Sequence, residues 1–374
     1  MQKKAAAVLA LLFLLCLVLP GAASLAAPDR TFSEQENRVL ASIPAFTGNA
    51  LLSGRYTADL ETYLSDQFIQ RDAWLAVQAW SVRLLGRHEN GGIFFGSRDT
   101  LLPRLADPDP AQVEANAGYA EKLRAEADVP VLFALIPTAA EIWADRLPAN
   151  ADTADQSALI DAMCAVFQGP TADVLGALAA HRDEEIFYRT DHHWTTLGAY
   201  YGYCAVLEAM GISPQPLSAF TPVTVADDFF GTSCSASGAV WTAPDRIETF
   251  VPEPAGLTVT EISGGESTAG RLYHPNKLAE RDKYAFFLGG VQPVIVLETG
   301  RPEGERLLIL RDSFADALTP FLPEHFAEIH LLDPRYYHAG SVQDYIRENA
   351  IDRVLILYSV PNFVAERSLG AVIR

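Results

Sequence analysis

The chain has 374 residues, of which 47 are acidic and 28 are basic, so its formal net charge is −19. Hydrophobic residues make up 49% of the chain and charged residues 20%, which excludes general disorder and is enough for a large core. The acidic excess argues against a general affinity for nucleic acid, because binding of phosphates needs an excess of Lys and Arg. We therefore expect a globular protein with no nucleic-acid partner.

Residues 1–27 have the layout of an export signal. Two lysines precede an uncharged apolar run from Ala5 to Leu19, and residues 24–26 place small side chains before a cleavage point. The whole uncharged stretch, from Ala5 to Ala27, is also long enough to span a bilayer. The sequence therefore predicts a signal peptide or an N-terminal membrane anchor, followed by one functional domain over residues 28–374. We expect an extracytoplasmic protein, secreted or anchored to the outer face of the cytoplasmic membrane, with membrane contact only through this segment.

The chain has four cysteines. Cys16 lies in the leader, and the other three are Cys164, Cys204 and Cys234. Three thiols allow one disulfide at most, and their long spacings do not fit a zinc site. We expect buried free thiols rather than a disulfide framework.

Hydrophobic periodicity predicts a series of helices and strands beyond the leader. The expected helices cover about residues 53–85 (interrupted near 67–71), 111–127, 154–168, 195–210 and 341–349, and the expected strands cover 129–136, 185–188, 306–310, 329–332 and 354–358. Strands that alternate with helices indicate a parallel, three-layer α/β/α sandwich. Residues 212–300 carry short strand-like runs and many Gly, Ser, Thr and Pro, so we expect a β-rich insertion or edge extension there.

Two segments combine the residue types of acyl-transfer chemistry. The run 190–194 contains Asp191, His192 and His193, and an apolar strand turns into a helix at Ser313. Such a serine presents its hydroxyl at the carboxyl edge of the sheet, and its backbone N–H is suited to an oxyanion. A histidine could accept the serine proton and a carboxylate could orient that histidine, which predicts a Ser–His–Asp triad.

Each of these residues also has an ordinary structural interpretation. Ser313 and Asp191 are both suited to capping a helix N-terminus, and a single histidine is usually structural. A metal site built from Asp191, His192 and His193 is a further alternative. We expect no metal, because neighbouring side chains of an extended segment point in opposite directions.

The Asp-His-His-Trp run at 191–194 resembles the signature of the DHHW family of exported bacterial proteins. That family resembles the alginate O-acetyltransferases, whose domain is SGNH-hydrolase-like. The likeness covers about residues 30–365. Other runs that match the family are Phe32-Ser33-Glu34, Glu36-Asn37-Arg38, Asp66-Gln67-Phe68, Arg71-Asp72, Pro137-Thr138, Phe230-Gly231-Thr232, Phe287-Leu288-Gly289-Gly290 and Arg311-Asp312-Ser313-Phe314.

The resemblance implies an SGNH-like fold and a role for each residue of the triad. Ser313 is the expected nucleophile, His193 the base and Asp191 the acid that orients it, whereas His192 occupies a variable position. Arg311 replaces the glycine that precedes the Asp-Ser pair in the relatives, which alters the expected fit of substrate.

Three further residues are candidates for binding. A positive side chain at Arg311 would attract an anionic substrate, and Trp194 is a candidate for substrate contact. Asn362 is a candidate donor to the oxyanion hole, beside the Ser313 N–H, or else a turn residue after a proline.

The resemblance implies O-acetyl transfer to, or acetyl-ester hydrolysis on, an extracytoplasmic polysaccharide. No metal or organic cofactor is required. The expected partners are a polysaccharide acceptor and an acetyl donor, with a membrane acyltransferase as the supplier of acetyl groups. The alternative is a non-catalytic carbohydrate-binding or envelope-assembly protein on the same scaffold, and the Arg311 replacement is its main support.

Overall fold

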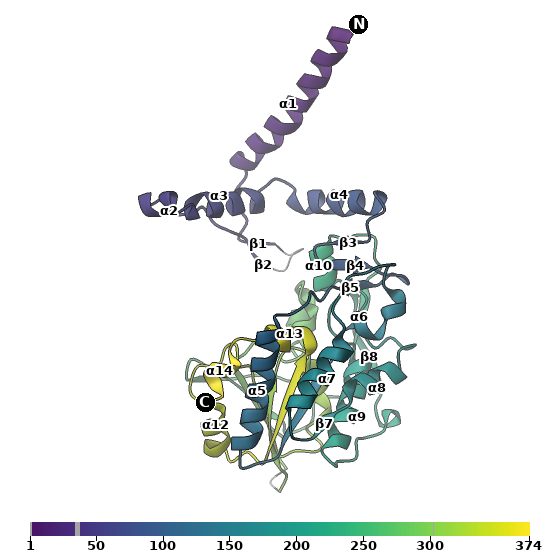
Figure 1. Ribbon diagram of the computed structural model, residues 1–374, viewed down its shortest axis with the longest axis vertical. Coiled ribbons are helices and arrows are strands. Elements are labelled where there is room, and N and C mark those ends of the chain that lie inside the picture. Colours follow the sequence, from purple (N-terminus) through teal and green to yellow (C-terminus); the bar gives the residue numbers. More distant parts are fainter. Residues whose placement is uncertain (1, 34–37, 302) are drawn as a thin grey trace. The chain divides into compact units, whose positions relative to one another are not determined.

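The computed structural model describes residues 2–33, 38–301 and 303–374 (Figure 1). The chain divides into two compact units: Met1–Asn90 with Ser235–Trp241, and Gly91–Cys234 with Thr242–Arg374. The family-like run at 32–38 is covered only in part, because Glu34, Glu36 and Asn37 lie outside the described residues.

The first unit begins with α1 (Gln2–Ala26), an apolar helix with Pro20 inside it. Its stretch Lys4–Ala26 is long and apolar enough to cross a membrane, judged by length and composition. A signal sequence and a membrane anchor share these properties, so the choice between the two stays a prediction.

Two residues of a family-like run, Asp66 and Gln67, link parts of the first unit that are distant in sequence. Its elements are β1 (Phe32–Ser33), β2 (Arg38–Val39), α2 (Gly48–Leu52), α3 (Arg55–Asp66), α4 (Arg71–Leu84) and β3 (Glu89–Asn90). The Gln67 amide accepts from the Arg30 N–H at 2.8 Å and donates to the carbonyl oxygens of Arg30 and Ala41. Asp66 accepts from the Ala41 N–H at 2.9 Å. These side chains therefore fasten Arg30 and Ala41 to the end of α3.

The second unit is built on an eight-stranded sheet with the order β11-β10-β12-β14-β13-β15-β6-β7. Its strands are β6 (Val131–Ile136), β7 (Thr171–Ala172), β10 (Thr258–Ser263), β11 (Glu266–Ala269), β12 (Val294–Glu298), β13 (Arg306–Arg311), β14 (Glu328–Leu332) and β15 (Arg353–Ser359). The strands from β14 to β7 are parallel, and β12, β10 and β11 join antiparallel at the β14 edge. The carboxyl ends of the parallel strands therefore meet at one edge, as predicted.

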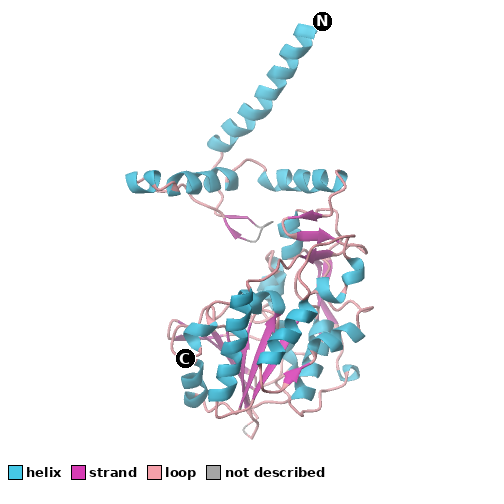
Figure 2. Ribbon diagram, viewed as in Figure 1, coloured by secondary structure: helices cyan, strands magenta, loops and turns pink. Residues whose placement is uncertain are grey.

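Helices cover both faces of this sheet (Figure 2). One face packs against α5 (Pro110–Glu126), α7 (Gln156–Val166), α12 (Val342–Glu348), α13 (Val360–Ala365) and α14 (Leu369–Val372). The other packs against α6 (Ala139–Ile142), α8 (Val174–Ala180), α9 (Thr196–Ala209) and α11 (Ala315–Leu318). Alternate residues of β13 enter the two cores: Leu308 and Leu310 one, Leu307 and Ile309 the other. This confirms the predicted α/β/α sandwich.

The segment 212–300 is both an insertion and an edge extension. Its strands β8 (Val223–Phe229) and β9 (Asp245–Thr249) form a separate antiparallel pair, whereas β10 to β12 lengthen the main sheet. The short helices of the region are η2 (Leu217–Ala219), α10 (Thr232–Ser237), η3 (Pro275–Ala279) and η4 (Lys283–Phe286). Outside this segment, β4 (Ile93–Phe95) pairs with β5 (Leu101–Pro103), η1 covers Ala144–Arg146 and η5 covers Thr319–Phe321.

Two smaller predictions have different outcomes. Cys164, Cys204 and Cys234 are thiols outside any disulfide, as expected, with the first two half-buried and the third buried. The predicted strand at 185–188 is wrong: Phe187 and Trp194 form an isolated antiparallel bridge instead. The chain reverses direction between Phe187 and Trp194, so residues 185–188 do not join the main sheet.

Candidate active site

Ser313 lies where the sequence predicts, in the turn after β13 and before α11. Because β13 runs between the parallel strands β14 and β15, this turn lies at the carboxyl edge of the parallel part of the sheet. The Ser313 side chain is half-buried. Within the described chain, its backbone N–H donates no hydrogen bond, so this donor is available to a ligand.

Asp312 fixes the backbone around Ser313. Its buried carboxylate accepts from the Phe314 N–H at 3.0 Å and from the Ser359 N–H and hydroxyl at 2.9 and 2.6 Å. The side-chain amide of Asn362 donates to the same carboxylate at 2.8 Å. Since an amide carries two N–H donors, Asn362 keeps one for the predicted oxyanion hole, a role that stays a prediction.

The segment 190–194 is a tight reversal that leads into α9. The Tyr188 N–H donates to the His193 carbonyl at 3.2 Å, and the Thr195 N–H donates to the Ile186 carbonyl at 3.0 Å. The Thr195 hydroxyl then caps α9 by accepting from the Gly198 N–H. These bonds hold the reversal at both ends, so its side chains have a fixed direction.

Trp194 is buried, which corrects the prediction that it contacts substrate. Its indole N–H donates to the Phe314 carbonyl at 2.9 Å. A Cβ added at Gly202 of α9 would stand 2.6 Å from the indole ring, so the glycine makes room for it. Trp194 therefore ties the reversal to the turn that carries Ser313.

The structure brings Asp191, His193 and Ser313 into one hydrogen-bonded chain. His193 Nδ1 lies 2.6 Å from Asp191 Oδ1, and His193 Nε2 lies 2.7 Å from Ser313 Oγ, although 120 positions separate the last two residues. Because the carboxylate accepts the proton of Nδ1, the lone pair of the imidazole lies at Nε2, toward the serine hydroxyl. This is the geometry that a general base and its nucleophile need.

The second oxygen of Asp191 is held by Thr232, a residue that the sequence identified only as part of a family-like run. The Thr232 N–H and hydroxyl donate to Asp191 Oδ2 at 2.8 and 2.9 Å. Burial alone would raise the pKa of this carboxyl, which is 2% exposed, but His192, His193 and the hydrogen bonds hold the pKa well below its usual value. Asp191 is therefore ionised and suited to stabilising an imidazolium.

Gly231 allows this contact, because its backbone passes directly over the carboxylate. A Cβ at position 231 would lie 2.2 Å from the Cβ of Asp191. Gly231→Ala is therefore expected to displace Asp191 and to lower the free energy of unfolding by about 1–3 kcal/mol. Chemical denaturation measures the change in the free energy of unfolding. The rate of modification of Ser313 by an activated ester reports the displacement of Asp191.

The matched control for this change is Gly118→Ala. Gly118 is exposed inside α5, and a Cβ there meets nothing within 4 Å. It should raise the free energy of unfolding by up to about 1 kcal/mol, because alanine is the better helix former. Equal effects of the two substitutions would contradict the close contact at Gly231.

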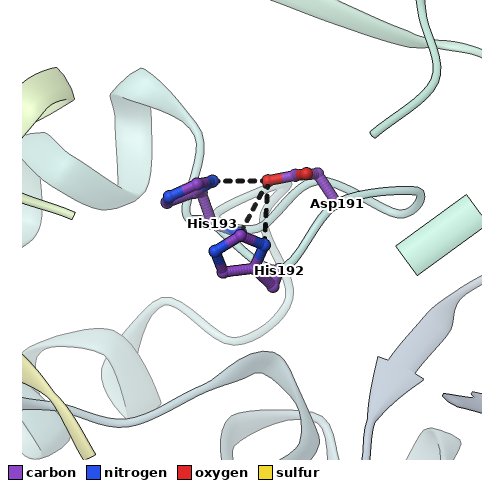
Figure 3. Close-up of side chains that lie close together, drawn as sticks. All are labelled: Asp191, His192 and His193. Atoms are coloured by element: carbon purple, nitrogen blue, oxygen red, sulfur yellow. Dashed lines mark hydrogen bonds and ion pairs between the residues drawn. The ribbon is translucent and has the colours of Figure 1, made fainter. Parts of the chain in front are cut away.

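His192 points the same way as His193, which corrects the expectation that the two neighbours diverge. Their ring centroids lie 3.8 Å apart, and Figure 3 shows both rings turned toward the carboxylate of Asp191. The ligand atoms of the three residues lie within 4.8 Å of one another. A cation among them would have to displace the 2.6 Å bond between Asp191 and His193, so the arrangement fits a triad better than a metal centre.

The His192 ring is neutral at pH 7. Burial and the neighbouring His193 lower its pKa to about 4. Its Nδ1 lies 2.6 Å from the Thr232 hydroxyl, which also contacts Asp191. His192 therefore supports Thr232 rather than Ser313.

Tyr284 is a site residue that the sequence analysis missed. Its ring stacks on the His193 imidazole, with centroids 3.7 Å apart and planes at 8°, and its hydroxyl donates to the Ser313 carbonyl at 3.1 Å. The signal was faint: Tyr284 precedes the family-like run at 287–290 by three positions. One buried side chain thus positions both the candidate base and the candidate nucleophile.

Two substitutions separate the contacts of Tyr284. Tyr284→Phe keeps the stacking and loses one hydrogen bond, so Ser313 modification by an activated ester should slow by about tenfold. Tyr284→Leu also removes the stacking on the His193 imidazole, so it should slow the modification of Ser313 further. Tyr345→Phe, which removes a buried bond to His330 in the other core, should leave the rate unchanged; a loss equal to that of Tyr284→Phe would mean that the effect is general destabilisation.

Arg311 does not face a substrate, which corrects a further prediction. The residue is 1% exposed, and its Nη1 lies 2.6 Å from Asp316 Oδ1. Burial raises the pKa of Asp316 to about 7 against the opposing effect of Arg311. The positive charge is directed into α11, so it does not attract an anionic ligand to Ser313.

Comparisons with known proteins agree on the family and the fold. The family model for DHHW protein matches residues 113–332, which is more than half of the chain and includes Asp191, His193 and Ser313. No curated protein matches the chain.

Two solved structures share the fold. A DHHW family protein from Eubacterium siraeum is 23% identical, with a TM-score of 0.63 over 76% of this chain and 95% of that one. PatB1 of Bacillus cereus, in a structure with a sulfonyl adduct, is 22% identical, with a TM-score of 0.60 over 73% and 95% of the two chains. These likenesses confirm the predicted α/β/α fold, and the match to the family model shows that the chain belongs to the DHHW family.

Proposed function

We propose that this protein transfers acetyl groups to the hydroxyl groups of a polysaccharide outside the cytoplasm, or removes them, through an acetyl ester on Ser313. The observation that carries the proposal is the hydrogen-bonded chain from Asp191 through His193 to Ser313. Such a chain raises the reactivity of a serine that is weakly nucleophilic by itself. The apolar helix α1 supports the location, since it fits a leader or an anchor.

The geometry suggests two half-reactions. In the first, His193 Nε2 takes the proton of Ser313 as Oγ attacks the carbonyl carbon of the acetyl donor, and Asp191 stabilises the imidazolium. The unpartnered N–H of Ser313 is placed to donate to the oxyanion. The donor's leaving group departs with the proton from His193, and the acetyl group remains on Ser313.

The second half-reaction decides the overall activity. His193 deprotonates either a sugar hydroxyl or a water molecule, which attacks the acetyl carbon and releases Ser313. Transfer therefore requires that the acceptor excludes water from the acetyl-enzyme. A membrane acyltransferase that delivers acetyl groups across the membrane is the expected partner.

The PatB1 structure adds support from a relative. It was solved with a sulfonyl adduct, and sulfonylating reagents react with activated nucleophiles. The non-catalytic alternative, by contrast, loses its main argument because Arg311 is paired with Asp316 inside the protein. No described feature specifically favours it over catalysis.

Intact-protein mass spectrometry tests the proposal. Incubation with p-nitrophenyl acetate should add one acetyl group, and peptide mapping should place it on Ser313. A neutral or acetyl-free polysaccharide that removes the group faster than buffer alone would indicate a transferase, and equal rates an esterase. The absence of any adduct with several activated acetyl esters and sulfonyl fluorides would contradict the proposal.

A further inference from the structure

A cavity of about 750 Å³ lies in the second unit, and its lining includes neither Ser313 nor His193. Residues from several segments form it, among them Arg98, Trp143, Arg146, Arg189 and Phe250. The volume is that of a typical small-molecule site. Nothing in the acetyl-transfer chemistry uses this space.

Arg146 is a buried cation without an anionic partner. The residue is 8% exposed, and its guanidinium makes no hydrogen bond or ion pair with any residue that the structure describes. Its Nε is fully enclosed, whereas the residue as a whole lines the cavity. Burial lowers the pKa of Arg146, and so do the nearby Arg98 and Arg182; the charges of Asp145 and Asp183 oppose this effect without reversing it. Enclosing a charge without a partner is costly, so such a group commonly serves a ligand.

Trp143 holds this guanidinium in place. The Arg146 Cζ lies 3.6 Å from the centre of the indole ring, and the indole N–H is itself fixed by a 2.9 Å bond to the Arg182 carbonyl. Stacking occupies one face of the guanidinium and leaves its N–H donors in the plane. Those donors match the two oxygens of a carboxylate or phosphate.

The other charges of the cavity are largely matched within the protein. Arg189 contacts Asp245 at 3.3 Å and Asp99 at 3.5 Å, and Arg246 contacts Glu248 at 3.7 Å. The remaining acidic residues of the lining, Asp183, Glu184 and Glu185, are exposed. Arg146 therefore adds a buried positive charge to the lining, whereas the acidic residues that have no arginine partner there are exposed.

We propose that this cavity is a second site, which binds an anionic group of the carboxylate or phosphate class on a sugar-sized ligand. Arg146 donates to the oxyanion in a bidentate manner, and the aromatic side chains of the lining contact the apolar faces of the ligand. This site goes beyond acetyl transfer and does not depend on it, since Ser313 takes no part in binding here.

Isothermal titration calorimetry tests the second site. The probes are glucuronate, glycerol 3-phosphate and glucose, and the Ser313→Ala protein is titrated beside the wild type so that any chemistry is absent. Both proteins should bind one or both anionic probes and should not bind glucose. The two anionic probes distinguish a carboxylate from a phosphate ligand.

Arg146→Met keeps the stem of the side chain and removes its charge, so the dissociation constant should rise at least about tenfold. Arg146→Lys keeps the positive charge but loses the bidentate N–H donors of the guanidinium, so it should weaken binding less than Arg146→Met does. Arg347→Met, which removes an exposed arginine of α12 that is paired with Asp344 and lies outside the cavity lining, should bind as the wild type does.

The proposal is overturned if neither anion binds or if glucose binds as tightly as the anions do. It is also overturned if Arg146→Lys and Arg146→Met leave the dissociation constant of the anionic probe unchanged. Thermal unfolding of each variant shows whether it is folded. Should Arg146→Met fail to fold, Arg146→Lys and the wild-type titrations still decide the question. Loss of acetylation at Ser313 with intact anion binding would reject the proposed function alone.

Discussion

Replacing Ser313 by Ala should abolish formation of the acetyl-enzyme. The substitution removes the oxygen that carries the acetyl group, and no other hydroxyl of the described residues bonds to His193 Nε2. Intact-mass spectrometry after incubation with p-nitrophenyl acetate should show the unmodified mass, and turnover of acetyl esters should fall to the level of buffer. The half-buried position of the side chain means that the free energy of unfolding should change little.

Ser81→Ala is the control for this experiment, because Ser81 is exposed on α4. It should acquire the acetyl group as the wild type does. Full acetyl transfer or esterase activity in Ser313→Ala, under conditions where the wild type is active, would reject Ser313 as the nucleophile.

Replacing His193 by Ala should cost about 10⁶-fold in the rate of acetylation, the size of loss known for the base of a serine triad. Asp191→Asn should cost up to about 10⁴-fold, because an amide at position 191 favours the wrong imidazole tautomer. Pre-steady-state release of p-nitrophenol measures both rates.

His192→Ala is the matched comparison, since the neighbouring ring contacts Thr232 rather than Ser313. Its loss should be much smaller than that of His193→Ala. If His192→Ala were the more damaging change, the role of base would pass to His192.

The fold was predictable from the sequence because its signals are local. Buried strands contain continuous apolar runs, such as residues 131–136 of β6 and 307–310 of β13, and Gly211 ends α9 with a positive φ of 75°. The placement of Ser313 follows from the same logic, since a serine after a central parallel strand must lie at the carboxyl edge. The strand expected at 185–188 failed because its residues pair across a reversal instead of joining the sheet.

The supporting residues of the site were not predictable in the same way. Thr232 and Tyr284 lie 41 and 29 positions from Asp191 and Ser313, and only the folded chain brings them together. Arg311 and Trp194 have residue types that suit ligand binding, yet both are buried. Sequence alone does not show the direction of a side chain at the end of a strand, and that direction determines the role of Arg311.

The segment 212–300 has a consequence for attempts to reduce this protein to a minimal enzyme. It is irregular and lies partly outside the main sheet, so it resembles a region that can be trimmed. Yet Gly231 and Thr232 cover one side of Asp191, and Tyr284 covers the face of His193. A chain without this segment would retain Asp191, His193 and Ser313 but would lose the contacts that align them. The segment 212–300 and the candidate catalytic residues therefore have to be kept together when this protein is shortened or redesigned.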